Sequence, residues 1–194
     1  MGNSTSVHAM LGSRNIAKND RAEHDYYATE PKAAHLLMQV ERFSPSIWEC
    51  ACGEGHLAKV FEQYGHTVYA SDLVDRGYGE QLDFLEVSSP PVSGADIITN
   101  PPYILATDFV RHALEISEDR RKIAMFLKIQ FLEGKERRKL FEEHPPKTIY
   151  VSSSRLHCAR NGDFAKAKEA NAICFAWYIW EKGWRGDTVV KWIN

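Results

Sequence analysis

The chain has 194 residues, of which 44% are hydrophobic and 26% are charged, a composition typical of one globular domain. No stretch approaches the roughly 18 consecutive apolar residues of a membrane-spanning helix, which excludes integral membrane proteins. The four cysteines lack the spacing of a zinc site and are too few for a disulfide framework, so we expect no metal. Because the N-terminus lacks a secretory signal pattern, the sequence predicts a cytoplasmic protein with reduced thiols.

Charge is unevenly divided along the chain. Residues 1–100 contain 7 Lys and Arg against 14 Asp and Glu, a net charge of −7, whereas residues 101–194 contain 17 against 12, a net charge of +5. This division is compatible with two surfaces that meet different partners, and equally with ordinary solvated helix faces.

The elements follow from periodicity and from turn residues. Residues 1–24 are polar and predict a flexible arm, which leaves 25–194 as a single domain. Thr29 is expected to cap a helix whose first turn holds Pro31, and further helices are expected at 57–64, 107–116 and 133–144. The predicted strands are 46–52, 67–73, 95–99, 122–131, 147–151, 172–180 and 189–193.

The order of these elements predicts the fold class. Strands and helices alternate from 47 to 151, which indicates a parallel sheet covered by helices on both faces. The last two strands have no helix between them, which predicts an antiparallel hairpin at the sheet edge. The sequence therefore predicts an α/β, Rossmann-like domain with a mostly parallel seven-stranded sheet.

A glycine pair follows the first of these strands. Gly53-x-Gly55-x-x-Ala58 fits the fingerprint of nucleotide-binding folds, and Asp72 lies where an acidic residue accepts ribose hydroxyls. This pattern suits NAD and S-adenosylmethionine (SAM) alike. Glu49 favours SAM, because a carboxylate would repel a pyrophosphate but can hold the amine of a methionine group. The alternative for Glu49 is an exposed carboxylate at a strand end.

A third acidic position precedes an aromatic residue. Asp83 can accept a hydrogen bond from the amino group of adenine, while Phe84 lies against the adenine ring. A loop aspartate before a core phenylalanine explains the same two residues equally well.

The tetrapeptide Asn100-Pro101-Pro102-Tyr103 directly follows a strand, where two prolines stiffen the carboxyl edge of the sheet. The side-chain oxygen of Asn100 and the carbonyl of Pro101 can accept both hydrogens of a planar amine. This localises the nitrogen lone pair, which then attacks a sulfonium methyl in line. Tyr103 offers a face for stacking a base drawn out of its helix, worth about 1–3 kcal/mol.

These motifs resemble those of SAM-dependent amino-methyltransferases. Four stretches resemble the small DNA N6-adenine methyltransferases of phages and prophages, namely 48–56 (WECACGEGH), 71–77 (SDLVDRG), 131–134 (FLEG) and 177–183 (WYIWEKG). The resemblance runs from about Asp25 to the C-terminus. It implies a class I SAM-dependent methyltransferase fold, SAM as cofactor, DNA as substrate and methyl transfer to N6 of adenine.

By this resemblance, Tyr27, Thr29 and Pro31 match the helix-start motif that closes over the methionine end of SAM. The full set of implied SAM-binding residues is Tyr27, Thr29, Pro31, Glu49, Ala51, Cys52, Gly53, Gly55, Asp72, Leu73, Asp83, Phe84 and Asn100. Ala51 stands where many relatives have glycine, and the chain lacks a large target-recognition domain.

The connection 152–171 is the candidate recognition insert. It is basic, and Arg155, Arg160 and Lys166 are expected to contact the phosphates of the substrate. The run Arg137-Arg138-Lys139 is better explained as a solvated helix face. Three other functions remain open: methylation of an RNA base or a protein glutamine, a catalytically silent module that binds SAM or DNA, and an NAD-dependent dehydrogenase.

Overall fold

The computed structural model describes residues 26–160, 162, 164 and 173–194. The expected arm at 1–24 lies outside the described residues, as does most of 161–172. The helices are α2 (Pro31–Val40), α3 (Ala58–Gln63), α4 (Ala106–Ile116) and α5 (Lys135–Glu143), with short 3-10 turns η1 (Phe84–Glu86), η2 (Tyr103–Leu105) and η3 (Ile129–Leu132). Among the described residues, no helix is long and apolar enough to cross a membrane.

One large sheet organises the molecule. Its eight strands run in the order β10 (Val189–Ile193), β7 (Thr148–Ser152), β9 (Phe175–Glu181), β6 (Lys122–Lys128), β5 (Asp96–Thr99), β2 (Ser46–Glu49), β3 (Thr67–Asp72) and β4 (Glu80–Gln81). Neighbouring strands are parallel except that β9 lies antiparallel between β6 and β7. The predicted α/β class, with a mostly parallel sheet and an antiparallel pair, is confirmed. The last two strands, β9 and β10, do not form the expected hairpin, because β7 lies between them and β10 is parallel to β7.

The strand count differs from the expected seven because β4 has only two residues, too few for periodicity to reveal. A second, two-stranded sheet also went unpredicted, in which β1 (Tyr27–Thr29) pairs antiparallel with β8 (Cys158–Arg160). Thr29 does not cap α2, contrary to expectation: it ends β1, and the residue before the helix is Glu30, whose side chain makes no capping hydrogen bond.

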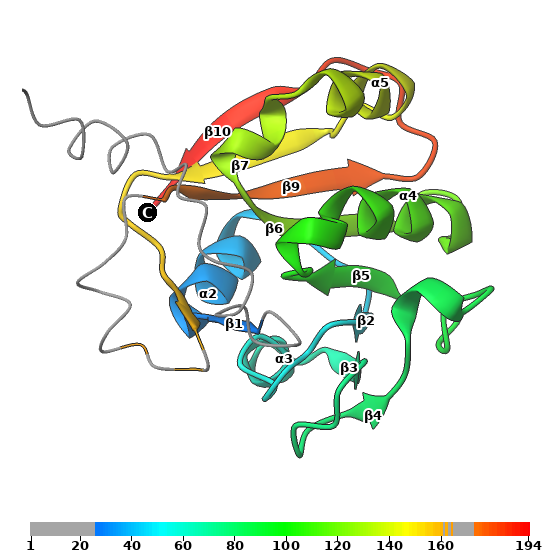
Figure 1. Ribbon diagram of the computed structural model, residues 1–194, viewed down its shortest axis with the longest axis vertical. Coiled ribbons are helices and arrows are strands. Elements are labelled where there is room, and N and C mark those ends of the chain that lie inside the picture. Colours follow the sequence, from blue (N-terminus) through cyan, green and yellow to red (C-terminus); the bar gives the residue numbers. More distant parts are fainter. Residues whose placement is uncertain (1–25, 161, 163, 165–172) are drawn as a thin grey trace, which may run out of the picture.

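Both faces of the sheet are covered, as Figure 1 shows. Helices α2 and α3 pack on one face against residues such as Phe126 and Trp177, and α4 and α5 pack on the other against residues such as Met125 and Tyr178. The alternation of these neighbours along each strand follows from the opposite directions of successive side chains.

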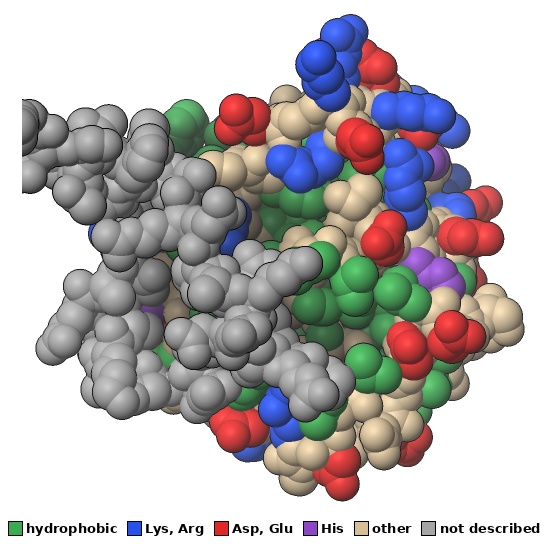
Figure 2. Space-filling model, in the orientation of Figure 1, with side chains coloured by type: hydrophobic (Ala, Val, Ile, Leu, Met, Phe, Trp, Pro, Cys, Tyr) green, Lys and Arg blue, Asp and Glu red, His purple; other side chains and the backbone are tan. Residues whose placement is uncertain are grey.

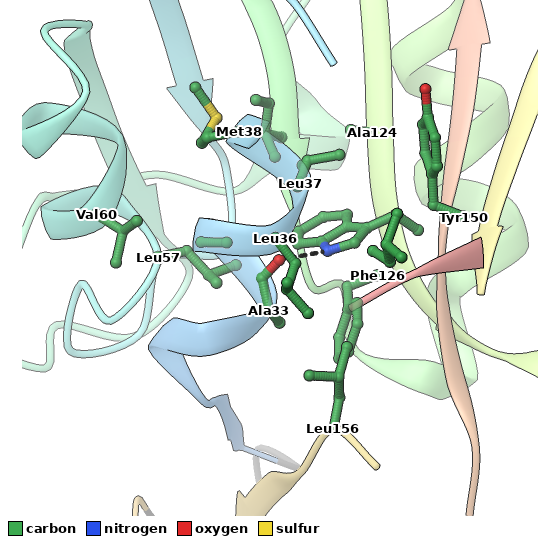
Figure 3. Packing of buried hydrophobic residues seen from close by; sticks show 14 of the residues in the cluster. Ala33, Leu36, Leu37, Met38, Leu57, Val60, Ala124, Phe126, Tyr150 and Leu156 are labelled. Atoms are coloured by element: carbon green, nitrogen blue, oxygen red, sulfur yellow. Dashed lines mark hydrogen bonds between the residues drawn. The ribbon is translucent and has the colours of Figure 1, made fainter. Parts of the chain in front are cut away.

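Trp177 joins β9 to α2. Its side chain is fully buried, its ring lies 4.9 Å from that of Phe126, and its Nε1 donates to the carbonyl of Ala33 at 2.9 Å. Figure 3 shows this bond between the indole and the first turns of α2. The contact ties the first turn of α2 to β9 of the large sheet.

We expect Trp177→Phe to lower the free energy of unfolding by about 1–2 kcal/mol, because it removes a buried hydrogen bond and leaves a small void. Urea denaturation followed by circular dichroism measures this loss. Trp192 is 71% exposed, so Trp192→Phe is the matched control and should change stability by less than about 0.5 kcal/mol. Equal effects of the two substitutions would contradict this account of α2.

Candidate active site

A cavity of about 550 Å³ lies at the carboxyl ends of β2, β3 and β5. After β2 the chain adds β3 and β4 on one side of that strand and then β5 and β6 on the other, so the strand order reverses at β2. Ligands bind at such points in open α/β sheets. Thirteen of the predicted site residues line this cavity: Tyr27, Thr29, Glu49, Ala51, Cys52, Asp72, Leu73, Asp83, Phe84, Asn100, Pro101, Pro102 and Tyr103.

The remaining predicted residues lie elsewhere. Pro31 begins α2 and is exposed, and Arg155 is exposed; neither lines the cavity. Lys166 and the side chain of Arg160 lie outside the described residues. The backbone of Arg160 is described as the last residue of β8, so part of the insert expected at the sheet edge forms a strand that crosses to β1.

Glu49 ends β2 and is 1% exposed, which excludes the alternative of an exposed strand-end carboxylate. Burial raises the pKa of the Glu49 carboxyl well above its usual value, the nearby Asp72 adds to the rise, and the backbone N–H of Ala58 opposes it. Its Oε2 has no hydrogen-bond partner in the described part of the chain. A cationic donor in the cavity would therefore satisfy a buried oxygen that the protein leaves unpaired.

Asp72 holds the loop after β2 in place. Its Oδ2 accepts from the N–H of Gly53 at 2.8 Å, and its Oδ1 accepts from the N–H of Val74 at 3.0 Å. A carboxylate has about four acceptor sites, so capacity for ribose hydroxyls remains. The neighbouring Leu73 is 51% exposed and adds an apolar wall to the cavity.

The two predicted glycines pack against aromatic side chains and do not line the cavity themselves. Gly53 has φ +54°, and a Cβ there would lie 2.3 Å from the ring of Tyr26. Gly55 has φ +76°, and its Cβ would lie 2.4 Å from the ring of Tyr78. These contacts alone require glycine at both positions, and the approach of the backbone to a cofactor stays a prediction.

Asp83 and Phe84 have the loop and core contacts that one of the two interpretations gave them, and their contact with adenine stays a prediction. Asp83 Oδ1 accepts from the N–H of Leu85 at 2.9 Å and so caps η1. The ring of Phe84 is buried against Phe109, at 4.7 Å, and Trp48, at 5.2 Å. Both residues nevertheless line the cavity, so the turn and the core packing place them where an adenine could lie.

Asn100 directly follows β5 and is anchored at one end of its amide. Its Nδ2 donates to the backbone carbonyl of Tyr27 at 2.9 Å, whereas its Oδ1 is buried and has no hydrogen-bond partner among the described residues. The carbonyl of Pro102 accepts from the N–H of Leu105 at 2.9 Å. The predicted second acceptor, the Pro101 carbonyl, belongs to a buried residue on the cavity wall.

Tyr103 is more enclosed than its predicted role requires. Its ring lies 5.4 Å from that of Tyr27 and 6.0 Å from that of Phe175, and Lys128 Nζ lies 4.2 Å from the ring centre. Its hydroxyl is buried beside the Cys158 thiol, and burial raises its pKa well above 10. A base that stacks on Tyr103 would have to displace one of these neighbours.

A polar cluster that the sequence did not predict borders the cavity, which is lined by Tyr26, His56 and Arg76 of this cluster. The Tyr26 hydroxyl lies 3.4 Å from both Glu54 Oε2 and His56 Nδ1, and the guanidinium of Arg76 lies 4.3 Å from its ring centre. Burial raises the pKa of Tyr26 to about 12. The only sequence signal was an aromatic pair, Tyr26-Tyr27, just before a helix start.

Basic and acidic side chains are mixed over α5, as Figure 2 shows for one face of the molecule. There Arg138 pairs with Glu142 and Lys139 with Glu143, which supports the solvated-face interpretation for these two residues. Among the described residues, no group of three or more His, Cys, Asp or Glu side chains is arranged to hold a metal ion.

The packing of Tyr26 on Gly53 gives a stability prediction. Gly53→Ala should destabilise the fold by about 1–3 kcal/mol more than Gly65→Ala, because only the first variant overpacks a neighbour. Gly65 also has positive φ, +85°, but no atom lies within 4 Å of its added Cβ, so it controls for backbone strain. Thermal denaturation measures both. In a Tyr26→Ala background, Gly53→Ala should no longer destabilise the fold more than Gly65→Ala does. If the additional loss of stability stays the same in that background, the contact between Tyr26 and residue 53 is not its cause.

Comparisons with known proteins bear on the fold. No protein-family model and no curated protein matches the sequence. A protein from Pyrococcus horikoshii assigned as an RNA methyltransferase matches with a TM-score of 0.55 and 14% identity over 78% of this chain and 81% of that one.

Two further solved structures agree. A protein from Listeria monocytogenes assigned as a class I SAM-dependent methyltransferase has a TM-score of 0.54 and 15% identity over 94% of this chain and 69% of that one. A protein from Vibrio vulnificus assigned as the modification subunit of a type I restriction enzyme has a TM-score of 0.57 and 13% identity, over 94% of this chain and 49% of that one. The chain therefore has the fold of class I SAM-dependent methyltransferases.

Proposed function

We propose that this protein transfers a methyl group from SAM to the exocyclic amine N6 of adenine in DNA. The observation that carries the proposal is the unpartnered, buried Oδ1 of Asn100 on the wall of a cavity that fits a nucleoside cofactor. An oxygen that can only accept, held beside a rigid pair of prolines, suits the recognition of an N–H group.

The residues of the cavity fit SAM better than NAD. Glu49, Asp72 and Asp83 place three carboxyl groups around one cavity. An ammonium donor would pair with the orphaned Glu49 Oε2, and the ribose hydroxyls and adenine amine are donors for the other two. A pyrophosphate in the same place would be repelled. This argues against the dehydrogenase alternative.

The chain's own residues account for the chemistry by position. When bound, SAM supplies a methyl group on a positively charged sulfur, and that sulfur leaves as a neutral thioether. Asn100 Oδ1 and the Pro101 carbonyl would each accept one N–H of the adenine amine and direct its lone pair at the methyl carbon. The new N–C bond forms as the C–S bond breaks, and the spare proton passes to solvent. Positioning of this kind lowers a barrier by several kcal/mol.

The choice of DNA adenine rests on the motifs at 48–56, 71–77, 131–134 and 177–183, which resemble small phage and prophage enzymes. Arg155, Arg160 and Lys166 of the insert are proposed to contact the substrate phosphates, in a cytoplasmic enzyme. Two alternatives keep the fold: an acceptor in RNA or a protein glutamine, and a silent module that binds without turnover. The unpartnered Asn100 oxygen argues against a silent module, because binding alone does not need it.

The decisive assay incubates the protein with methyl-labelled SAM and methylation-free genomic DNA, then digests the DNA and identifies the labelled nucleoside. We expect N6-methyl-2′-deoxyadenosine. Asn100→Ala should lower turnover about 10²–10³-fold, the usual effect of removing one positioned hydrogen-bonding group, and should weaken SAM binding, measured by calorimetry, by a much smaller factor. If the label appears on RNA or protein instead of DNA, the acceptor is an RNA base or a protein glutamine rather than DNA adenine. SAM binding without transfer to any of the three would favour the silent module.

Glu49→Gln gives a second test, with opposite effects on binding and on stability. Loss of a charged partner for the SAM ammonium should weaken SAM binding about 10–100-fold. The Glu49 pKa is raised in the folded state, so wild-type stability is lost as pH rises from the unfolded pKa through the folded one. The variant should therefore be more stable than wild type at pH 8, and this advantage should vanish at pH 4.

Denaturation at both pH values checks this, and Glu86→Gln is the control, since Glu86 is exposed and outside the cavity. Tight SAM binding by the Glu49→Gln variant would remove Glu49 from the cofactor site.

A further inference from the structure

The side-chain amide of Asn100 has a donor end and an acceptor end, and their directions decide what it can recognise. The Nδ2 end donates to the Tyr27 carbonyl at 2.9 Å and lies 3.9 Å from the Cys158 sulfur. A backbone carbonyl only accepts, so the reversed amide would set two oxygens against each other. The Tyr27 carbonyl thus fixes Nδ2 as the donor end. It leaves Oδ1, which is buried and has no hydrogen-bond partner among the described residues, as the acceptor end of a residue that lines the cavity.

The register of β1 on β8 sets the direction of the Tyr27 carbonyl. Ala28 is paired with Ala159, and the N–H of Glu30 donates to the carbonyl of His157 at 3.1 Å. Backbone groups of successive residues point alternately toward and away from the partner strand of an antiparallel ladder. Because the backbone of Glu30 points toward β8, that of Tyr27, three residues earlier, points away from it and toward Asn100.

The same strand pair is held firmly at its other end. The Glu30 carboxylate accepts from the N–H of His157 at 2.7 Å, so backbone and side chain of Glu30 both bind this residue. Thr29 and Cys158 face each other across the ladder and are both buried. Cys158 borders the hydroxyl of Tyr103 and the amide of Asn100, so the strand pair contacts the tetrapeptide at two residues.

We propose that the β1–β8 pair is a positioning element for the reaction, because the Tyr27 carbonyl orients the Asn100 amide. This carbonyl requires an amide rather than a carboxylate at position 100. The proposal rests on the proposed function, in which Asn100 Oδ1 accepts from the substrate amine. It adds a separate claim, that the identity of the residue at 100 is dictated by a carbonyl from a strand about 70 residues earlier.

The substitution Asn100→Asp would place a carboxyl group beside the Tyr27 carbonyl. An ionised carboxylate would be repelled by the Tyr27 carbonyl and would turn away from the working geometry. A protonated carboxyl group can donate its O–H to that carbonyl and still present its other oxygen to the amine. Burial and this hydrogen bond both raise the pKa of the new carboxyl, so the competent form becomes more populated as pH falls.

The test is the pH dependence of kcat between pH 5.5 and 8.5 for wild type, Asn100→Asp and Asn100→Ala, with saturating SAM and an adenine-containing duplex. Above the pKa of the new carboxyl, Asn100→Asp should gain about tenfold in kcat for each unit that pH falls, relative to wild type. Asn100→Ala, which has no acceptor, should show no such gain. Wild-type-like activity of Asn100→Asp with an unchanged profile, or no gain at low pH, would overturn the proposal.

A stability measurement keeps the proposal testable if the acceptor is not adenine. The unfolding free energy of Asn100→Asp, relative to wild type, should fall as pH rises from 5 to 8, because the folded-state pKa of the new carboxyl is raised. A difference that is constant with pH would overturn the interaction with Tyr27, whereas absence of methyl transfer by wild type would overturn only the proposed function.

Glu30→Ala tests the strand pair through a residue outside the cavity. It should lower kcat several-fold. Because Tyr27 and Thr29 of the same strand line the cavity, the dissociation constant of SAM should rise as well, but by a smaller factor. A kcat equal to that of wild type would show that the β1–β8 pair does not position Asn100.

Discussion

The hydrogen bond from Asn100 to the Tyr27 carbonyl joins two parts of the molecule that are far apart in the sequence. The ends of β2, β3 and β5 form only the floor of the cavity; residues 26–29 form a wall over it. This wall stays in place because Tyr26 packs on Gly53, Tyr27 packs on Tyr103, and β1 pairs with β8. Without these contacts, the sheet would present an open edge with no enclosed site.

The three carboxylates of the cavity differ in how their charge is satisfied. Asp72 and Asp83 accept backbone N–H groups and thereby fix the loops that carry them. Glu49 is the most buried of the three and keeps one oxygen without a partner. Burial of a carboxyl oxygen that lacks a partner costs free energy. In the proposed function, the ammonium group of SAM would supply that partner.

The aromatic contacts around Tyr103 connect the site to dynamics. The tetrapeptide is stiff, because two prolines precede Tyr103 and η2 begins with it. Lys128 ends β6, and its Nζ lies 4.2 Å from the centre of the Tyr103 ring. In the proposed function, a base that stacks on Tyr103 would displace one of the side chains around the ring.

The sequence by itself determined the parallel sheet, the position of the cavity at its carboxyl edge, and most of the residues that line it. These features are local: apolar periodicity marks a strand, Gly53 and Gly55 mark a turn, and the prolines mark where β5 stops. Only the tertiary structure decided that Thr29 lies in a strand, that Glu49 is buried, and that Tyr26 and Arg76 stand at the cavity mouth. The strand at Thr29 depends on β1 pairing with β8, more than 120 residues away in the sequence, and three-residue strands carry too few side chains for their pattern to specify a partner at that separation.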